Sequence, residues 1–347
     1  MIRTFMSSVT RISDLTQDNF DTSRLARDHW ATGDYVVGKV QDISGHLTAI
    51  EMPNGRMIDV MEDDLVIGAF GTRVATLEAV GDWRSIDESG HFNALTSAGL
   101  FGKTTSLSPF LSSPMRLVYQ GHVTRNDAKV TMSGSLPEIE IVDFDIPVIL
   151  IVGTSMSAGK TMSGRVIVHM LSQMGLNVVG AKLTGAARYR DMLSFGDAGA
   201  SAIYDFVDAG LPSTVVPEEE FRAAIRPLLS HIARRDADFM VVEAGASPLE
   251  PYNGAAAIEE LGASVRCCVL CATDPYAVVG VQKAYGLMPD LVAGPATNTS
   301  AALDLVEKLT GLPGINIIDP DQLPVFRDFL VHILRIDAET RRVPGSA

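Results

Sequence analysis

Cysteine, tryptophan and long hydrophobic runs are all scarce in this sequence. The 347 residues include only three cysteines and two tryptophans, too few cysteines for the disulfide framework of a small secreted domain. The longest apolar runs, Val148 to Val152 and Val265 to Ala272, are far shorter than the roughly 20 residues that span a bilayer. The N-terminus also lacks a basic segment followed by an apolar one. We therefore expect a soluble, cytoplasmic protein with no membrane partner.

Positive charge is also in short supply. The sequence has 28 Lys and Arg residues against 42 Asp and Glu residues, a net charge of −14, and its pI is near 4.9. Such a chain would repel nucleic acid, so no nucleic-acid partner is expected. Hydrophobic residues make up 46% of the chain, which is enough for buried cores, and the length suggests two domains.

The three cysteines, Cys267, Cys268 and Cys271, all fall in one apolar segment. Cys268 and Cys271 form a C-x-x-C pair, which could bind a metal ion or form a disulfide, but no second pair accompanies it. The alternative, which the apolar neighbours favour, is a buried strand in which the thiols behave as small hydrophobic groups. The seven histidines have no ligand spacing, and we predict no zinc site.

The segment from Ile146 to Thr161 has the pattern of a phosphate-binding loop. The apolar run Val148 to Val152 is rich in β-branched residues and predicts a buried strand. A turn of glycine and small residues follows, and it leads into a helix whose first N–H groups have no partner within the helix. This arrangement binds anions. The predicted nucleotide-binding residues of the loop are Gly153, Thr154, Ser155, Met156, Ser157, Ala158, Gly159, Lys160 and Thr161.

Two residues indicate a particular ligand, a polyphosphate with bound Mg²⁺, among the anions that such a loop could bind. Lys160 would place an ammonium group against the β- and γ-phosphates, and the Thr161 hydroxyl would coordinate Mg²⁺. The spacing is Gly-x5-Gly-Lys-Thr, one residue longer than the usual loop. The alternative is an ordinary strand, turn and helix with a chance Gly-Lys-Thr.

The N-terminal part predicts a small β-rich domain. Short alternating runs, separated by turn residues, begin near residue 32. One short helix is expected at Asp21 to His29. The predicted strands are Asp34–Val40, Leu47–Met52, Met57–Val60, Leu65–Ala69, Val74–Val80 and Met115–Val123.

Two groups of residues in this domain could contact a ligand. Gly99 to Ser106 superficially resembles a second phosphate loop, but it lacks the first glycine and a preceding buried strand; an anion contact and an ordinary loop both stay open. The second group could shape a pocket or fill ordinary strand and turn positions. It consists of Asp82, Trp83, Tyr119, His122 and Arg125.

We predict a β-rich domain over residues 1–135, a linker over 136–146 and a nucleotide-binding α/β domain over 147–347. In the last of these, strands and helices alternate. That pattern predicts a P-loop NTPase-type α/β fold, with a mostly parallel sheet and helices on both faces. The final helix is expected at Gln322 to Ile336. The predicted strands lie near 147–152, 177–182, 213–216, 238–243, 265–272, 290–294 and 314–318.

Ligands of such sheets bind at the carboxyl ends of the strands, where further polar residues occur. Lys182 ends one predicted strand, and Thr184 and Arg188 follow it. Glu243 ends another strand after four apolar residues. Asp197 is expected to open a helix between these strands. We predict that Asp197 and Glu243 hold Mg²⁺ with Thr161; the alternatives are a solvated strand end for Lys182 and a helix cap for Asp197.

Taken together, the loop and the polar residues at the strand ends resemble the motifs of the dethiobiotin synthetase group of P-loop proteins, over about residues 147–319. The likeness includes the extended loop, the lysine at Lys182, the acid at Asp197, the segment Val242 to Ala246 and a purine-contacting asparagine at Asn298. Ala244 replaces a glycine of that family. The C-terminal half is also similar to the C-terminal domain of the D-glutamate N-acetyltransferase family. That family shares the loop, often lacks the final threonine, and is thought to use acetyl-CoA.

The resemblance implies an enzyme that uses ATP and Mg²⁺ to activate a carboxylate or carbamate of a small metabolite, as a ligase or cyclo-ligase does, with Lys160 and Lys182 as catalytic residues. Thr184, Arg188 and Ser247 are the predicted substrate contacts. A homodimer is expected, because related sites often lie at a two-fold interface. Two alternatives stay open, an acetyl-CoA-dependent N-acyltransferase acting on an amino acid and a nucleotide-gated switch without a small-molecule product.

Overall fold

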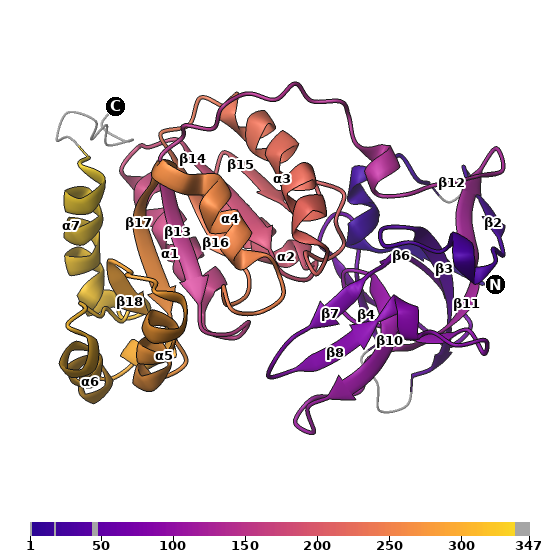
Figure 1. The fold of residues 1–347 in the computed structure, drawn as a ribbon, viewed down its shortest axis with the longest axis horizontal. Coiled ribbons are helices and arrows are strands. Elements are labelled where there is room, and N and C mark those ends of the chain that lie inside the picture. Colours follow the sequence, from indigo (N-terminus) through magenta and orange to yellow (C-terminus); the bar gives the residue numbers. More distant parts are fainter. Residues whose placement is uncertain (1, 17–18, 44–47, 337–347) are drawn as a thin grey trace. The chain divides into compact units, whose positions relative to one another are not determined.

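The computed structural model describes residues 2–16, 19–43 and 48–336, and the chain forms two compact units (Figure 1). The β unit comprises residues 1–139, 185–190 and 206–228, and the α/β unit comprises 140–184, 191–205 and 229–347. The first border in the chain thus falls in the segment predicted as a linker. Two later segments that belong to the β unit have no signature in the sequence.

The β unit is built on a 10-stranded sheet, together with a separate pair of strands. Within the sheet, β6, β3, β11, β9 and β10 are paired in that order, and a further pairing of β10 with β6 closes the ring. Closure removes the unpaired edges that an open sheet would expose. The strands are β1 (Thr4–Met6), β2 (Asp21–Ser23), β3 (Tyr35–Asp42), β4 (Ala49–Glu51), β5 (Met57–Asp59), β6 (Leu65–Phe70), β7 (Thr72–Val74), β8 (Ala79–Asp82), β9 (His91–Ala94), β10 (Leu100–Leu107), β11 (Arg116–Arg125) and β12 (Ala128–Lys129).

Most predicted strands of this unit are present, and two predictions are wrong. Asp21 to His29 is not a helix, because β2 pairs with β11 and only Arg27–His29 forms a 3-10 turn. Val74 to Val80 is not one strand, since β7 and β8 form an antiparallel pair joined by a turn. The strand predicted from Leu47 is β4, and Leu47 itself lies outside the described residues.

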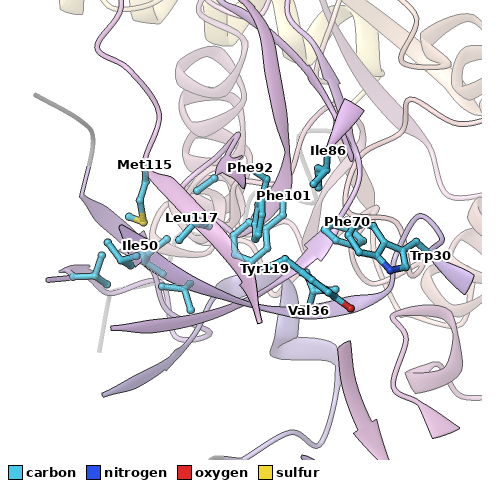
Figure 2. Packing of buried hydrophobic residues seen from close by; sticks show 14 residues of the cluster. Trp30, Val36, Ile50, Phe70, Ile86, Phe92, Phe101, Met115, Leu117 and Tyr119 are labelled. Atoms are coloured by element: carbon cyan, nitrogen blue, oxygen red, sulfur yellow. The ribbon is translucent and has the colours of Figure 1, made fainter. Parts of the chain in front are cut away.

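Aromatic side chains fill the interior of the β unit (Figure 2). Trp30 stacks on Phe70 with 4.9 Å between ring centroids, and Phe92 lies 5.2 Å from Phe101. Rings of this size bury a large apolar area and stabilise the core by about 0.5–1.5 kcal/mol per pair beyond area burial. These aromatic pairs therefore add to the stability of a unit whose strands are short.

A buried polar network crosses this core and accounts for two of the residues predicted to shape a pocket. The Tyr119 hydroxyl is hydrogen-bonded to Nδ1 of His122 (2.6 Å), and Nε2 of His122 is hydrogen-bonded to Asp34 (3.1 Å). Lys129 donates to both carboxylate oxygens of Asp34. Buried polar groups need such partners. Tyr119 and His122 are therefore structural.

The remaining residues of that predicted group also have local structural contacts. Asp82 accepts a hydrogen bond from the backbone N–H of Arg84, and Arg125 forms an ion pair with Asp14. The Trp83 ring donates its N–H to the Thr32 hydroxyl. Each of these three residues thus has a hydrogen bond or ion pair of its own within the β unit.

The α/β unit has a six-stranded sheet in the order β15-β14-β16-β13-β17-β18, with every pairing parallel. Helices flank it (Figure 1), so the predicted fold class is confirmed. Its strands are β13 (Val148–Gly153), β14 (Val178–Thr184), β15 (Ala202–Asp205), β16 (Phe239–Ala244), β17 (Val265–Cys271) and β18 (Leu291–Ala293). The helices are α1 (Lys160–Gln173), α2 (Tyr189–Asp197), α3 (Glu218–Ala233), α4 (Gly254–Leu261), α5 (Pro275–Tyr285), α6 (Ser300–Thr310) and α7 (Leu323–Leu334). The first residues of α2 and α3 are assigned to the β unit.

Two strand predictions in this unit are wrong. Residues 213–216 form no strand; Ser213 makes only an isolated bridge with Ala186, and the sheet strand is β15. Residues 314–318 likewise contribute only a bridge, between Gly314 and Val292. β15 is a short edge strand with half-buried residues, so its apolar pattern is too weak to mark it.

The cysteines lie in β17, as the apolar pattern indicated, and no disulfide joins them. Burial raises the pKa of the thiols, to about 11 for Cys271 and about 12 for Cys268, from an ordinary value of 9.0. The neutral thiol is also a poor nucleophile. The C-x-x-C pair is therefore part of the core.

We expect these thiols to resist iodoacetamide at about pH 8 in the native protein and to react in concentrated urea. Because their folded pKa values are raised, their contribution to stability is present below about pH 9 and is lost as the pH rises through 11 and 12. Mass spectrometry after labelling, and urea unfolding at several pH values, measure the two effects. Rapid labelling of the native chain would contradict this burial.

Candidate functional site

The glycine-rich loop connects β13 to α1 as predicted. Gly153 ends the strand, and a Cβ on Gly153 would lie 2.7 Å from Cδ and Nζ of Lys160. Gly159 precedes the helix with a φ of +90°, a backbone conformation that side chains disfavour. Each glycine therefore has a separate task, one making room for the lysine and the other turning the chain into α1.

Lys160 is folded back over the loop. Its Nζ donates to the carbonyl oxygens of Ser155 (2.6 Å) and Met156 (3.4 Å), and the residue is 2% exposed. Burial lowers the pKa of Lys160 from its ordinary value, and the charge of Glu243 opposes this effect. The result is an ammonium group held among the loop carbonyls at a strand end, where it can contact an anion on the loop.

The loop also contains unsatisfied polar groups. The Ser155 hydroxyl is buried and has no hydrogen-bond partner among the residues that the structure describes. The first N–H groups of α1 have no acceptor within the helix, because four such groups are orphaned at every helix start. A buried donor without a partner is costly, so these groups fit a phosphate ligand.

The connection after β18 forms a second wall against the loop. A Cβ on Gly294 would lie 2.4 Å from the carbonyl oxygen of Ala158, and a Cβ on Gly159 would lie 3.6 Å from Cα of Gly294 and 3.7 Å from Cδ of Pro295. Asn298 follows this contact, after a 3-10 turn, and is exposed. Its predicted contact with a purine remains a prediction.

Thr161 and Glu243 meet beside the loop. The Thr161 hydroxyl donates to Oε2 of Glu243 at 2.9 Å, and Glu243 is 2% exposed. Glu243 lies in β16, between Lys182 of β14 and Ile151 of β13. A hydroxyl paired with a buried carboxylate at a phosphate loop fits Mg²⁺, which takes one or two protein ligands and completes its shell with water and phosphate oxygens.

No group of three or more His, Cys, Asp or Glu side chains that could hold a metal ion occurs within residues 2–16, 19–43 and 48–336. Mg²⁺ does not require such a group, because phosphate oxygens usually supply part of its coordination shell.

Lys182 lies within an ion cluster next to Glu243. Its Nζ is hydrogen-bonded to Asp191 at 2.5 Å and lies 3.7 Å from Oε1 of Glu243. Burial alone would lower the pKa of Lys182, but Asp191 and Glu243 outweigh that effect and raise its pKa. Lys182 therefore stays charged, and it is not the solvated strand end considered as an alternative.

The prediction that Asp197 opens a helix is wrong. Asp197 is the last residue of α2 and is exposed, whereas Asp191 lies in the first turn. Six residues of α-helix separate them by about 9 Å. The carboxylate that shares Lys182 with Glu243 is thus that of Asp191, which the sequence analysis missed. Its only signal was its position soon after the strand that ends at Thr184.

The predicted substrate contacts differ in burial and in local hydrogen bonds. The Thr184 hydroxyl is buried and accepts a hydrogen bond from the Gly245 N–H at 3.1 Å, so it joins the ends of β14 and β16. Ser247 is 4% exposed and its hydroxyl accepts from the Leu249 N–H in a tight turn. Arg188 is exposed and belongs to the β unit. Their roles in substrate binding remain predictions.

No family model matches the chain, and no curated protein matches it either. Among solved structures, it is similar to HypB from Helicobacter pylori in complex with nickel, with 16% identity over 58% of this chain and 92% of that one and a TM-score of 0.36. FtsY from Thermotoga maritima has 15% identity over 51% of this chain and 63% of that one, with a TM-score of 0.36. A DUF1611 family protein from Anabaena variabilis has 16% identity over 58% of this chain and 63% of that one, with a TM-score of 0.35.

The matched region covers less than two thirds of the FtsY and DUF1611 chains. At these identities and TM-scores the likeness says nothing of function. The P-loop fold of the α/β unit rests on its own parallel strand order, its glycine loop and the contact of Thr161 with Glu243. No helix in the described part of the chain has both the length and the hydropathy of a membrane span.

Asp191 and Asp197 provide a matched pair of substitutions on one helix. Asp191→Asn removes the carboxylate that is hydrogen-bonded to the buried Lys182, and we expect it to lower the free energy of unfolding by about 3 kcal/mol. Asp197→Asn changes an exposed residue and should shift it by less than about 0.5 kcal/mol. Urea denaturation measures both. Equal effects would contradict the ion cluster around Lys182.

Proposed function

We propose that the α/β unit binds a nucleoside triphosphate with Mg²⁺ and transfers its terminal phosphoryl group. The observation that carries this proposal is the 2.9 Å hydrogen bond from Thr161 to the buried Glu243, beside the loop that holds Lys160. A loop that only gripped a phosphate would need no carboxylate there. A carboxylate next to a hydroxyl suits a metal ion bridging two phosphates.

The side chains have distinct tasks in this reaction. The loop N–H groups and Lys160 would bind the phosphates and stabilise charge that develops during transfer. Thr161 and Glu243 would hold Mg²⁺, which supplies neutralisation of the phosphate oxygens when bound. Lys182, fixed by Asp191 and Glu243, would present a permanent positive charge to the acceptor. Positioning, rather than covalent chemistry, would supply most of the rate.

For the acceptor we propose the oxygen of a carboxylate or carbamate on a small metabolite. The resemblance to dethiobiotin synthetases supports this class, and so does the charge on Lys182. Phosphoryl transfer to that oxygen forms an acyl phosphate, and an amine then attacks its carbonyl carbon and releases phosphate. ATP is the proposed nucleotide, in line with that resemblance, and GTP is the comparison in the test.

The test is incubation of the full chain with Mg-ATP, Mg-GTP or acetyl-CoA and a metabolite extract, followed by mass spectrometry. We expect nucleoside diphosphate together with a new ligated or cyclised product. Release of CoA with an acetylated amine would instead favour the acyltransferase. Slow diphosphate release without any new small molecule would favour the nucleotide-gated switch, and no consumption of any of the three would refute the site.

The homodimer expected from related sites remains part of the proposal. Light scattering on the purified chain, with and without Mg-nucleotide, measures the molar mass directly. A mass near twice 37.1 kDa would support it, and a monomer under both conditions would refute it.

A further inference from the structure

Glu51 is a buried carboxylate that the proposed function does not use. It is the last residue of β4 and has an exposed fraction of 0%. Its backbone is held in place, because the Glu51 N–H donates to the carbonyl oxygen of Ser97 at 2.8 Å and the neighbouring Ile50 packs in the aromatic core (Figure 2). Burying a carboxylate this deeply is costly unless other groups compensate for the lost water.

The groups that compensate for this carboxylate are hydrogen-bond donors. Oε1 of Glu51 accepts from the Ser8 hydroxyl at 2.5 Å and from the Tyr189 N–H at 2.8 Å, and Oε2 accepts from the Arg190 N–H at 3.2 Å. All four residues belong to the β unit. Glu51 forms no ion pair with any residue that the structure describes. Two of its three donors are thus the first backbone N–H groups of α2.

The residue before α2 cannot cap this helix. That residue is Arg188, and a guanidinium group has only donors, so its side chain cannot accept from the first N–H groups. Ser, Thr, Asp and Asn are the residues that usually cap a helix from this position. Glu51 takes this role from 138 residues before Tyr189, and a carboxylate suits the positive end of the helix dipole.

Asp191 directly follows the two capped residues. It is the third residue of α2, and its carboxylate is hydrogen-bonded to Lys182 at 2.5 Å. A helix of nine residues is marginal on its own, and helix ends fray. Without its cap, the first turn of α2 would open more often, and Asp191 would leave Lys182 each time.

The second half of α2 is anchored separately. Phe195 is fully buried, and Cβ atoms on Gly164 of α1 and Gly180 of β14 would lie 2.2 Å and 2.8 Å from its ring. The two glycines therefore make room for this ring. The packing of Phe195 holds α2 about one turn beyond Asp191 and leaves the first turn to Glu51.

We propose that Glu51 is a positioning residue for phosphoryl transfer, because it caps α2 and so keeps Asp191 on Lys182. The inference deepens the proposed function and rests on it in one respect, that Lys182 serves the transfer. Lys160 is held by the loop carbonyls and Thr161 by a residue of β16, so neither depends on α2. Loss of the cap should therefore slow the transfer and leave the affinity for Mg-nucleotide unchanged.

The first test measures α2 and Lys182 directly and needs no nucleotide. Glu51→Gln keeps the shape of the side chain but replaces one acceptor oxygen by an NH₂ group, which cannot accept a hydrogen bond. Mass spectrometry follows two rates, hydrogen exchange in the peptide with Tyr189 and Arg190, and acylation of Lys182 by acetic anhydride. Both rates should rise about 10-fold, because each depends on how often the first turn opens.

Asp64→Asn is the matched control. Asp64 is another buried carboxylate of the β unit, 4% exposed, which accepts from a backbone N–H and pairs with Arg3. Its replacement should destabilise the β unit but leave the exchange of α2 and the acylation of Lys182 unchanged. If Glu51→Gln does not fold, Ser8→Ala is the milder variant. It removes one donor from the carboxylate and should speed the acylation about threefold.

A double variant separates the route through Asp191 from general destabilisation. Asp191→Asn alone should speed the acylation of Lys182, and adding Glu51→Gln should speed it no further, because both changes act on one contact. Three results would overturn the proposal: unchanged acylation in folded Glu51→Gln or Ser8→Ala, an equal effect of Asp64→Asn, or additive effects in the double variant.

Transfer is measured separately on the same variants. In an active chain, Glu51→Gln should lower kcat about 10-fold and leave the Kd for Mg-nucleotide within about twofold of the parent value. A weaker Kd with unchanged kcat would contradict a role in transfer. A parent chain that transfers no phosphoryl group would count against the proposed function alone, since the exchange and acylation rates still decide whether Glu51 positions Asp191.

Discussion

Lys160→Ala is expected to lower the affinity for Mg-nucleotide about 100-fold or more and to abolish phosphoryl transfer. The loss of one charged contact to a polyphosphate at a buried site costs about 3 kcal/mol. Lys160 is the ammonium group that the loop carbonyls of Ser155 and Met156 hold in place. Calorimetry with excess Mg²⁺ measures the affinity, and product analysis measures the transfer.

The fold should survive this substitution. Removing Lys160 loses a hydrogen bond to Ser155 but also relieves the burial that lowers the pKa of this lysine, so the two effects oppose each other. Lys308→Ala, an exposed lysine on α6, is the matched control and should bind nucleotide as the parent does. If Lys160→Ala folds and still binds and transfers normally, the loop is not the nucleotide site.

Gly294→Ala is expected to have the second large effect, on both stability and nucleotide binding. Gly294 has a φ of +84°, and a Cβ there would lie 2.4 Å from the carbonyl oxygen of Ala158 and 3.1 Å from that of Ala272. Backbone on both sides cannot yield without moving the phosphate loop. We expect a loss of about 3 kcal/mol in unfolding free energy and weaker nucleotide binding.

Gly286→Ala separates the cost of a side chain at positive φ from the cost of a steric clash with neighbouring backbone. Gly286 has a φ of +77° and would place its Cβ in open space. It should therefore cost only the left-handed backbone penalty of about 1 kcal/mol and leave nucleotide binding unchanged. Urea denaturation and calorimetry on the two variants give the comparison. Equal losses in both would mean that Gly294 does not position the loop.

The sequence predicts the central strands of the α/β unit well because they are buried on both faces. β13 is a continuous apolar run, and β16 and β17 contain the runs Phe239 to Val242 and Cys267 to Cys271. Short apolar runs of this kind are typical of buried parallel strands. β15 is different: it lies at the sheet edge with half-buried residues, so local composition does not separate it from a loop.

The phosphate loop and its partner Glu243 are also predictable, since the loop follows a buried strand directly and Glu243 lies near the end of another. Asp191 is not, because its role depends on where α2 begins relative to Lys182. The separation of β9 and β10 in the β unit is the least visible feature in the sequence, because pairing between distant strands leaves little trace in local sequence.

The distribution of tryptophan and cysteine allows the two units to be followed separately during unfolding. Both indole rings, at Trp30 and Trp83, lie in the β unit, and all three thiols lie in β17 of the α/β unit. Tryptophan fluorescence, excited selectively, therefore reports only the aromatic core of the former, while the rate of thiol modification reports only the latter. Coincident transitions would show that the two units unfold cooperatively, and distinct transitions would reveal an intermediate with one unit folded.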